Sequence, residues 1–89
     1  MSTRVSDWRA AIDVLDGQLL TLLNTRARLA TELGKVKHEA GIGILDPDRE
    51  RQVLARLRQT NKGPLDEAAV TRIFARIIRE ARRIQACAE

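Results

Sequence analysis

The sequence contains few of the residue types that build disulfides, metal sites and stacking surfaces. Its one cysteine, Cys87, cannot form a disulfide within the chain, and its one histidine, His38, leaves no Cys/His cluster for a metal ion. Tyrosine is absent and Trp8 and Phe74 are the only aromatic residues, so stacking on single-stranded bases is not expected. Because these residue types are scarce, the fold and the function have to be predicted from the helix-packing pattern and from the charge.

Long apolar runs are missing as well. No stretch approaches the ~18 apolar residues of a membrane span, and the segment MSTRVSDWRA lacks the apolar run of a signal peptide. We therefore expect a cytoplasmic protein with no membrane segment. The 89 residues predict a single domain, 1–89, whose small core favours stabilisation by a partner chain.

The charge and the composition indicate the kind of partner and the fold class. The net charge is +4 and the sequence pI is about 10.2, which favours an anionic partner, either nucleic acid or a small polyanionic metabolite. Leucine, alanine, arginine and glutamate are frequent, and only two prolines occur. This composition predicts an all-α protein.

The first predicted helix is unusually long. Ser6 or Asp7 can cap its start, and no proline precedes the glycine-containing break at 41–43, so the helix should end near Glu39. About thirty residues form a rod of roughly 45–50 Å, which the rest of the chain is too short to cover. Its apolar residues alternate in spacing between three and four, the pattern of one helix packed along another: Trp8, Ile12, Leu15, Leu19, Leu22, Leu29, Leu33 and Val36. We call these eight residues the seam. The expected assembly is an intertwined helical homodimer.

Two shorter helices should follow. Asp46 is a good N-cap with Pro47 at the first helical position, and the segment 61–64 should break this second helix. Asp66 caps a third helix, whose apolar stripe runs from Val70 to Ile84. The predicted fold class is therefore all-α, with three helices per chain.

Several polar residues interrupt these apolar faces. Arg26 lies in the middle of the seam, and Lys37 follows three helical turns later on the same side, about 16 Å along the axis. Gln85 extends the stripe of the third helix, while Asp46 and Glu50 share one face of the second. Each residue alone has an ordinary structural explanation, such as snorkelling or capping. A buried charge is costly unless it is paired, so a group of charged residues on these faces suggests a bound ligand of complementary charge. Two cations, an amide and two carboxylates together suit a dianion that also carries a hydroxyl.

The combined motifs resemble the small all-helical chorismate mutases. The similarity covers about Trp8 to Gln85 and rests on WRAAIDVLDGQLLTLLNTRARLATELGKVK, on DPDRE and on the third helix ending in Gln85. It implies an intertwined dimer with two active sites and an isomerase of aromatic amino acid biosynthesis that converts chorismate to prephenate. That rearrangement is pericyclic and needs no nucleophile, metal or cofactor.

The resemblance also implies roles for individual residues. Arg26 resembles the arginine that binds a substrate carboxylate, and Arg9 resembles the arginine that the other subunit contributes. Lys37 and Gln85 match the pair that contacts the ether oxygen. Arg9 and Arg26 are seventeen residues apart, roughly 25 Å on a straight helix. If both serve one site, they must therefore come from different chains.

The remaining implied site residues surround the substrate ring. Asp46 and Glu50 match residues near the ring hydroxyl, and Arg49 matches a further arginine of the family motif. Ala81 departs from the family pattern, since the best-known relatives have a serine there that helps hold a carboxylate. This departure leaves the carboxylate contacts and the substrate preference open.

Three other functions remain compatible with the sequence. An isochorismate-pyruvate lyase would share the fold, although the acids Asp46 and Glu50 favour a mutase. A mutase for 4-amino-4-deoxychorismate is also compatible, because an acid accepts either an alcohol or an ammonium. The alternative from another class is a module that binds nucleic acid or an acidic partner protein through an arginine stripe on the third helix: Arg72, Arg76, Arg79 and Arg83. Docking of another pathway enzyme on the dimer is a separate possibility that the sequence leaves open. Such a stripe is more often a solvated face, so nucleic-acid binding is the weaker hypothesis.

Overall fold

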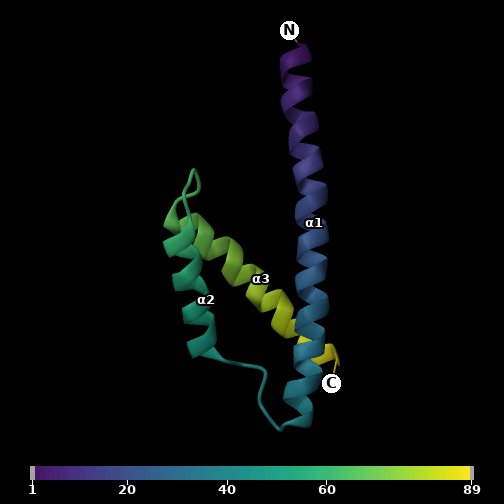
Figure 1. Cartoon of the computed structure of the whole chain (residues 1–89), viewed down its shortest axis with the longest axis vertical. Coiled ribbons are helices and arrows are strands. Elements are labelled where there is room, and N and C mark those ends of the chain that lie inside the picture. Colours follow the sequence, from purple (N-terminus) through teal and green to yellow (C-terminus); the bar gives the residue numbers. More distant parts are fainter. Residues whose placement is uncertain (1, 89) are drawn as a thin grey trace.

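The computed structural model describes residues 2–88, and the side chains of residues 4–86, so the side chain of Cys87 lies outside the described set. The described residues form three helices and no strand: α1 (Ser2–Glu39), α2 (Pro47–Thr60) and α3 (Glu67–Ala88). In Figure 1, α1 is a long rod, and α2 and α3 form a hairpin beside its C-terminal half. The predicted all-α fold with three helices is confirmed.

The start of α1 differs from the prediction. We expected a cap at Ser6 or Asp7, but the helix already runs from Ser2. That expectation was wrong because no proline or glycine lies between Ser2 and Asp7, and an exposed serine or aspartate can continue a helix as well as cap one. With 38 residues, α1 is about 57 Å long, and it begins about one turn earlier than expected.

Gly41 ends α1 at the predicted break. Its φ of 70° lies in the left-handed region, which glycine adopts without steric cost. The Ile42 amide donates to the Lys37 carbonyl at 2.8 Å, and the Gly41 amide donates to the His38 carbonyl at 3.1 Å. These two bonds form a Schellman motif, which closes the helix and turns the chain toward α2.

The two predicted N-caps are confirmed. Asp46 Oδ1 accepts a hydrogen bond from the Arg49 amide at 3.0 Å, with Pro47 in the first turn of α2. Asp66 Oδ1 accepts from the Ala69 amide at 2.7 Å at the start of α3. Each cap satisfies an amide that the helix itself leaves unpaired, and so fixes where the helix begins.

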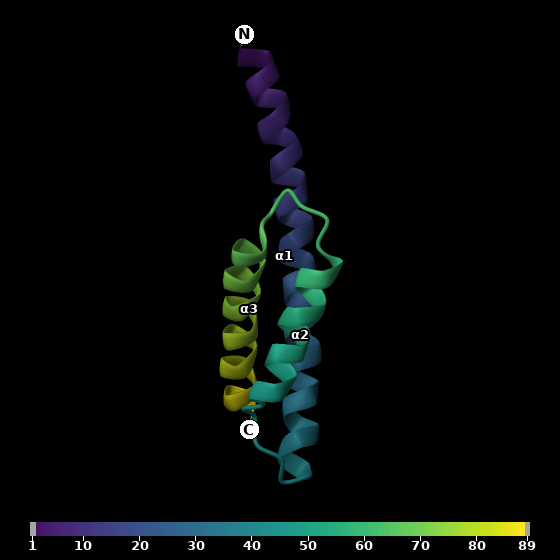
Figure 2. The same cartoon turned by 90° about the vertical axis from the view of Figure 1, so that its left-hand side faces the viewer.

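Helix α3 holds the fold together. It packs against both α1 and α2, whereas α1 and α2 make no close backbone approach within residues 2–88. Figure 2 shows α2 and α3 side by side along α1, with the N-terminal half of α1 extending beyond them. Among the described side chains, the buried ones are Val53, Val70, Ile78 and Gln85. The radius of gyration is 16.6 Å, well above the ~12 Å of a compact chain of this length.

Within residues 4–86, the rest of the chain leaves the seam of α1 uncovered. All eight of its residues are exposed, including Trp8 at 67% and Leu22 at 65%. Exposed apolar surface this extensive marks an interaction site. None of the described helices combines the length and the apolar character needed to span a bilayer.

Candidate active site

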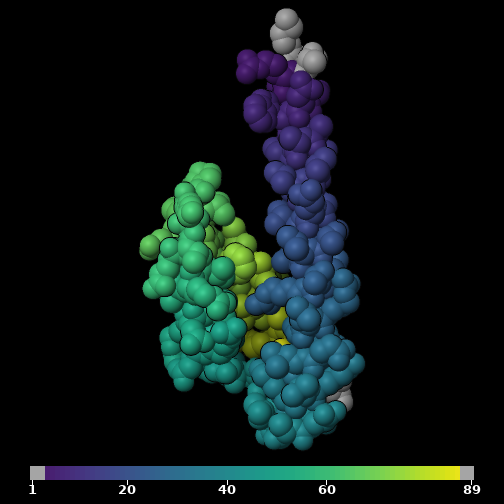
Figure 3. All heavy atoms as spheres, in the orientation of Figure 1, coloured from purple at the N-terminus to yellow at the C-terminus, as the bar shows by residue number. Residues whose placement is uncertain are grey.

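A cleft of about 280 Å³ lies between α1 and α2, with α3 behind it. The hollow is visible in Figure 3, between the blue part of α1 and the teal α2. Half of its lining residues are apolar and half are polar, with charged groups from all three helices. Seven of the eight residues predicted from the sequence line it: Arg26, Lys37, Asp46, Arg49, Glu50, Ala81 and Gln85.

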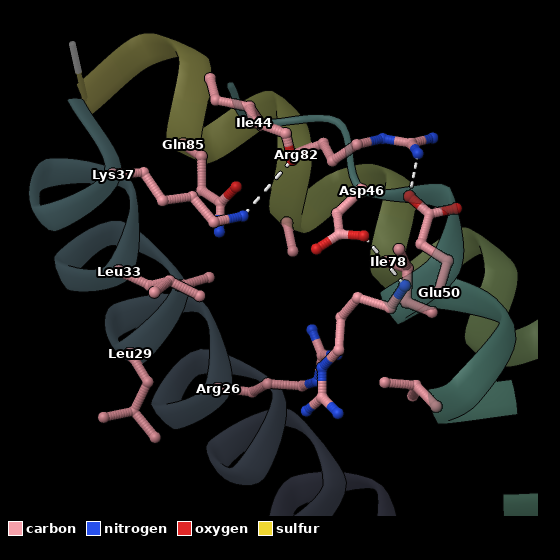
Figure 4. A pocket seen from close by; sticks show the side chains of 14 residues that line it. Arg26, Leu29, Leu33, Lys37, Ile44, Asp46, Glu50, Ile78, Arg82 and Gln85 are labelled. Carbon is pink, nitrogen blue, oxygen red and sulfur yellow. Dashed lines mark hydrogen bonds and ion pairs between the residues drawn. The ribbon is translucent and has the colours of Figure 1, made fainter. Parts of the chain in front are cut away.

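Helix α1 contributes two cations to the cleft. Arg26 and Lys37 are half-buried and enter from opposite ends (Figure 4). The Lys37 ammonium donates a hydrogen bond of 3.4 Å to the Ile44 carbonyl, in the segment that leads into α2. Within the described residues Arg26 forms no ion pair. Its charge is therefore available to a ligand.

Gln85 of α3 supplies an amide beside Lys37. The residue is only 6% exposed, and its amide lies next to the Lys37 ammonium (Figure 4). No side-chain nitrogen or oxygen in the described part of the chain is both sealed from solvent and without a hydrogen bond. Each polar atom of the Gln85 amide is therefore either accessible from the cleft or already hydrogen-bonded. An amide held by a buried residue at the wall of a cleft is well placed to bind a ligand.

Helix α2 and its N-cap residue contribute two carboxylates and a third cation. The Asp46 carboxylate that caps α2 also faces the cleft (Figure 4). The Arg49 guanidinium donates to Gln52 Oε1 at 3.0 Å. Glu50 is ion-paired with Arg82 of α3.

Arg82 is a cleft residue that the sequence analysis missed. It lines the cleft next to Ala81 and three residues before Gln85, so it shares one helix face with the predicted amide. That spacing was the available signal. The other arginines of α3 form a stripe on its outer face, so this spacing alone did not single out Arg82.

The cleft carries an excess of positive charge. Its four cations, Arg26, Lys37, Arg49 and Arg82, face the two carboxylates Asp46 and Glu50. A concave site with two surplus positive charges attracts a dianion. Ala81 contributes only a methyl group to this lining and offers no hydrogen-bond donor.

Arg9 is not part of the cleft of its own chain. It is exposed and lies seventeen residues before Arg26 on the same continuous helix, roughly 25 Å away. One chain therefore does not bring the two arginines together. The contribution of Arg9 to the cleft of a second chain therefore stays a prediction.

The arginine stripe on α3 is a solvated face. All four of its arginines are exposed. Arg76 and Arg83 both pair with Glu80, at 3.2 Å and 2.8 Å. This pairing reduces the charge that the stripe could offer to phosphates.

Comparison with known proteins identifies the family. A family model for chorismate mutase type II matches residues 8–86. The chain belongs to this family. The resemblance found in the sequence is thereby confirmed.

Curated relatives of this family differ in length. A bifunctional chorismate mutase/prephenate dehydratase of Neisseria gonorrhoeae is 40% identical over 78 residues, which cover 86% of this chain and 21% of the relative. The chain thus spans about a fifth of the length of that bifunctional protein. A chorismate mutase of Methanocaldococcus jannaschii is 31% identical over 86 residues, with 96% of this chain and 87% of the relative covered.

Solved structures of the family share the fold. A chorismate mutase from Thermus thermophilus superposes with a TM-score of 0.92 at 30% identity, covering 93% of this chain and 94% of the other. A chorismate mutase from Helicobacter pylori, in complex with prephenate, gives a TM-score of 0.90 at 30% identity, covering 97% and 93%. The three-helix arrangement is therefore that of the type II chorismate mutases.

Proposed function

We propose that this chain catalyses the rearrangement of chorismate to prephenate. The observation that carries the proposal is the convergence of Lys37 and Gln85 at one end of a cleft with surplus positive charge. Chorismate is a dianion, and its reaction transfers no group to or from the protein. Family membership and a relative solved with prephenate support the same reaction. We expect the enzyme to work in the cytoplasm, as a biosynthetic isomerase.

The first task of the site is to hold the reactive conformer. Chorismate is extended in solution, and the reaction requires the compact diaxial form in which the two reacting carbons meet. Arg26 would bind one carboxylate from within the cleft. Fixing the ends of the molecule in this geometry lowers the barrier by proximity and orientation.

The second task is to stabilise the charge that develops as the C–O bond breaks. While the C–C bond forms, negative charge grows on the ether oxygen. The Lys37 ammonium and the Gln85 amide would donate hydrogen bonds to that oxygen. Preorganised donors aimed at a developing charge bind the transition state more strongly than the substrate.

The acidic end of the cleft would recognise the ring. Asp46 and Glu50 can accept a hydrogen bond from the ring hydroxyl, with Arg49 close by. Ala81 lacks the hydroxyl that a serine would offer to a carboxylate. We expect Arg26 and a partner arginine to carry more of the carboxylate binding as a result.

A second copy of the chain would complete the site. The exposed seam of α1 supports an intertwined homodimer of two such helical domains, because a second α1 can cover it. In that assembly the partner's α1 would bring its own copy of residue 9 to the cleft. Each dimer would then have two equivalent sites.

A direct assay tests the proposal. Purified protein is incubated with chorismate, and NMR follows both its disappearance and the identity of the product. We expect prephenate. A parallel incubation with isochorismate, monitored for pyruvate release, tests the lyase alternative. Absence of any turnover of chorismate would overturn the proposal, and pyruvate release from isochorismate alone would assign the chain to lyase chemistry.

A further inference from the structure

One ion pair joins two residues of the cleft across the gap between helices. Arg82 of α3 donates to the Glu50 carboxylate of α2, thirty-two residues away in sequence. The side chains are 31% and 28% exposed, so solvent screens this pair only in part. The other ion pairs among the described residues join neighbours within one helix and lie outside the cleft.

This pair alters the charge that Glu50 presents to the cleft. Figure 4 shows Arg82 reaching the Glu50 carboxylate while Asp46 faces the cleft separately. One Glu50 oxygen is occupied by the guanidinium, and the other can still accept a hydrogen bond. The Arg82 charge offsets that of the carboxylate, and it would repel any further cation brought to the same place.

We propose that Arg82 is a specificity-determining residue that makes the Glu50 end of the cleft favour a neutral hydroxyl over an ammonium. The proposal rests on the proposed function, in which this end of the cleft receives the ring substituent of chorismate. A hydroxyl needs only one acceptor oxygen, which the paired carboxylate retains. An ammonium in its place would lie close to the Arg82 guanidinium, which offsets the Glu50 charge and leaves only the Asp46 carboxylate to attract it. Arg82 thereby acts against 4-amino-4-deoxychorismate, which differs from chorismate at this substituent.

The test compares two substrates in four proteins. The ratio of kcat/KM for 4-amino-4-deoxychorismate to that for chorismate is measured in the wild type, Arg82→Gln, Arg82→Lys and Arg83→Gln. Arg83→Gln is the matched control, because Arg83 is the next residue and pairs with Glu80 outside the cleft. We expect Arg82→Gln to raise the ratio about tenfold, the size of effect that a partly screened charge can exert. Arg82→Lys retains the charge and should keep the ratio near the wild-type value, as should Arg83→Gln.

The ratio of the two kcat/KM values distinguishes a role of Arg82 in specificity from a purely structural role. If Arg82 only held α2 against α3, Arg82→Gln would slow both substrates equally, and a ratio within about twofold of the wild type would overturn the proposal. Should Arg82→Gln prove unfolded by circular dichroism, Arg82→Met removes the same charge and keeps the aliphatic stem, with the same expectation. A wild type that converts neither substrate would overturn the proposed function itself. A wild type that converts chorismate, with an unchanged ratio in the variants, would overturn the role of Arg82 alone.

Discussion

Gly34 of α1 and Gln85 of α3 meet where the two helices cross. A Cβ atom added to Gly34 would lie 3.1 Å from Gln85 Cβ and 3.2 Å from Gln85 Cα. These distances are shorter than ordinary van der Waals contact, and one of the atoms belongs to the backbone of α3. The missing side chain at Gly34 therefore lets α3 approach α1 closely enough to bring the Gln85 amide beside Lys37.

Replacing Gly34 with alanine should lower kcat by about tenfold. The added methyl group would displace Gln85 by a few tenths of an ångström, and catalytic geometry is sensitive to shifts of that order. Alanine also favours the helical state by about 1 kcal/mol relative to glycine, which offsets part of the crowding. We therefore expect a larger change in kcat than in Tm, measured by steady-state kinetics and circular dichroism.

Gly17 provides the matched control on the same helix. A Cβ atom there would meet no atom within 4 Å beyond its own turn of helix, and residue 17 lies on the side of α1 opposite the seam. Gly17→Ala should leave kcat unchanged and raise Tm slightly. Equal kcat values for Gly34→Ala and the wild type would show that the close crossing is not needed for catalysis.

Lys37→Ala should reduce kcat by about 10²–10³-fold with little change in KM. The ammonium is proposed to bind the ether oxygen most strongly when that oxygen becomes charged, and removal of such a donor costs about this much. Lys35→Ala is the control, because Lys35 is exposed and pairs with Glu32 at 3.3 Å away from the cleft. A rise in KM alone would assign Lys37 to substrate binding instead.

Arg26→Leu should reduce kcat/KM by at least about 10²-fold while the protein stays folded. The half-buried guanidinium has no ion-pair partner among the described residues, so leucine removes a partly desolvated charge and continues the apolar seam. We expect Tm to stay constant or to increase. Arg28→Leu, two residues along the helix and outside the cleft, should retain activity. A strong fall in Tm for Arg26→Leu would instead assign Arg26 a structural role.

The helices were predictable where local signals define them. Asp46, Asp66 and Gly41 act through hydrogen bonds or backbone conformation within five residues, so the sequence alone located three helix ends. The start of α1 was not predictable in this way. Ser6 and Asp7 are compatible with either a cap or a helix interior, and no nearby residue decides between them.

The candidate site was predictable only in part. The spacing of Arg26 and Lys37 put both on one side of α1, and the structure finds both at the cleft. The Arg82–Glu50 pair depends instead on how α2 packs against α3, which no local spacing encodes. The role of Gly34 is likewise invisible until the crossing of α1 and α3 is known.

An active site shared between two chains predicts how dimers of two different variants behave. Suppose that each site takes Arg26 from one chain and Arg9 from the other. Homodimers of Arg9→Ala or of Arg26→Ala should then be nearly inactive. In a mixed dimer, one site carries both substitutions and the other carries none, because a two-fold axis repeats each contact with the chains exchanged.

Unfolding and refolding an equal mixture of the two variants should restore about a quarter of the wild-type activity. Random pairing makes about half of the dimers mixed, and each of these has one intact site of two. Mixing the folded variants without unfolding should restore activity slowly, since the long α1 helices must separate before the chains exchange. Size-exclusion chromatography and native mass spectrometry of differently tagged chains verify the exchange. If verified mixed dimers stay inactive, Arg9 does not complete the site across the interface, and each chain must bind the second carboxylate by another residue.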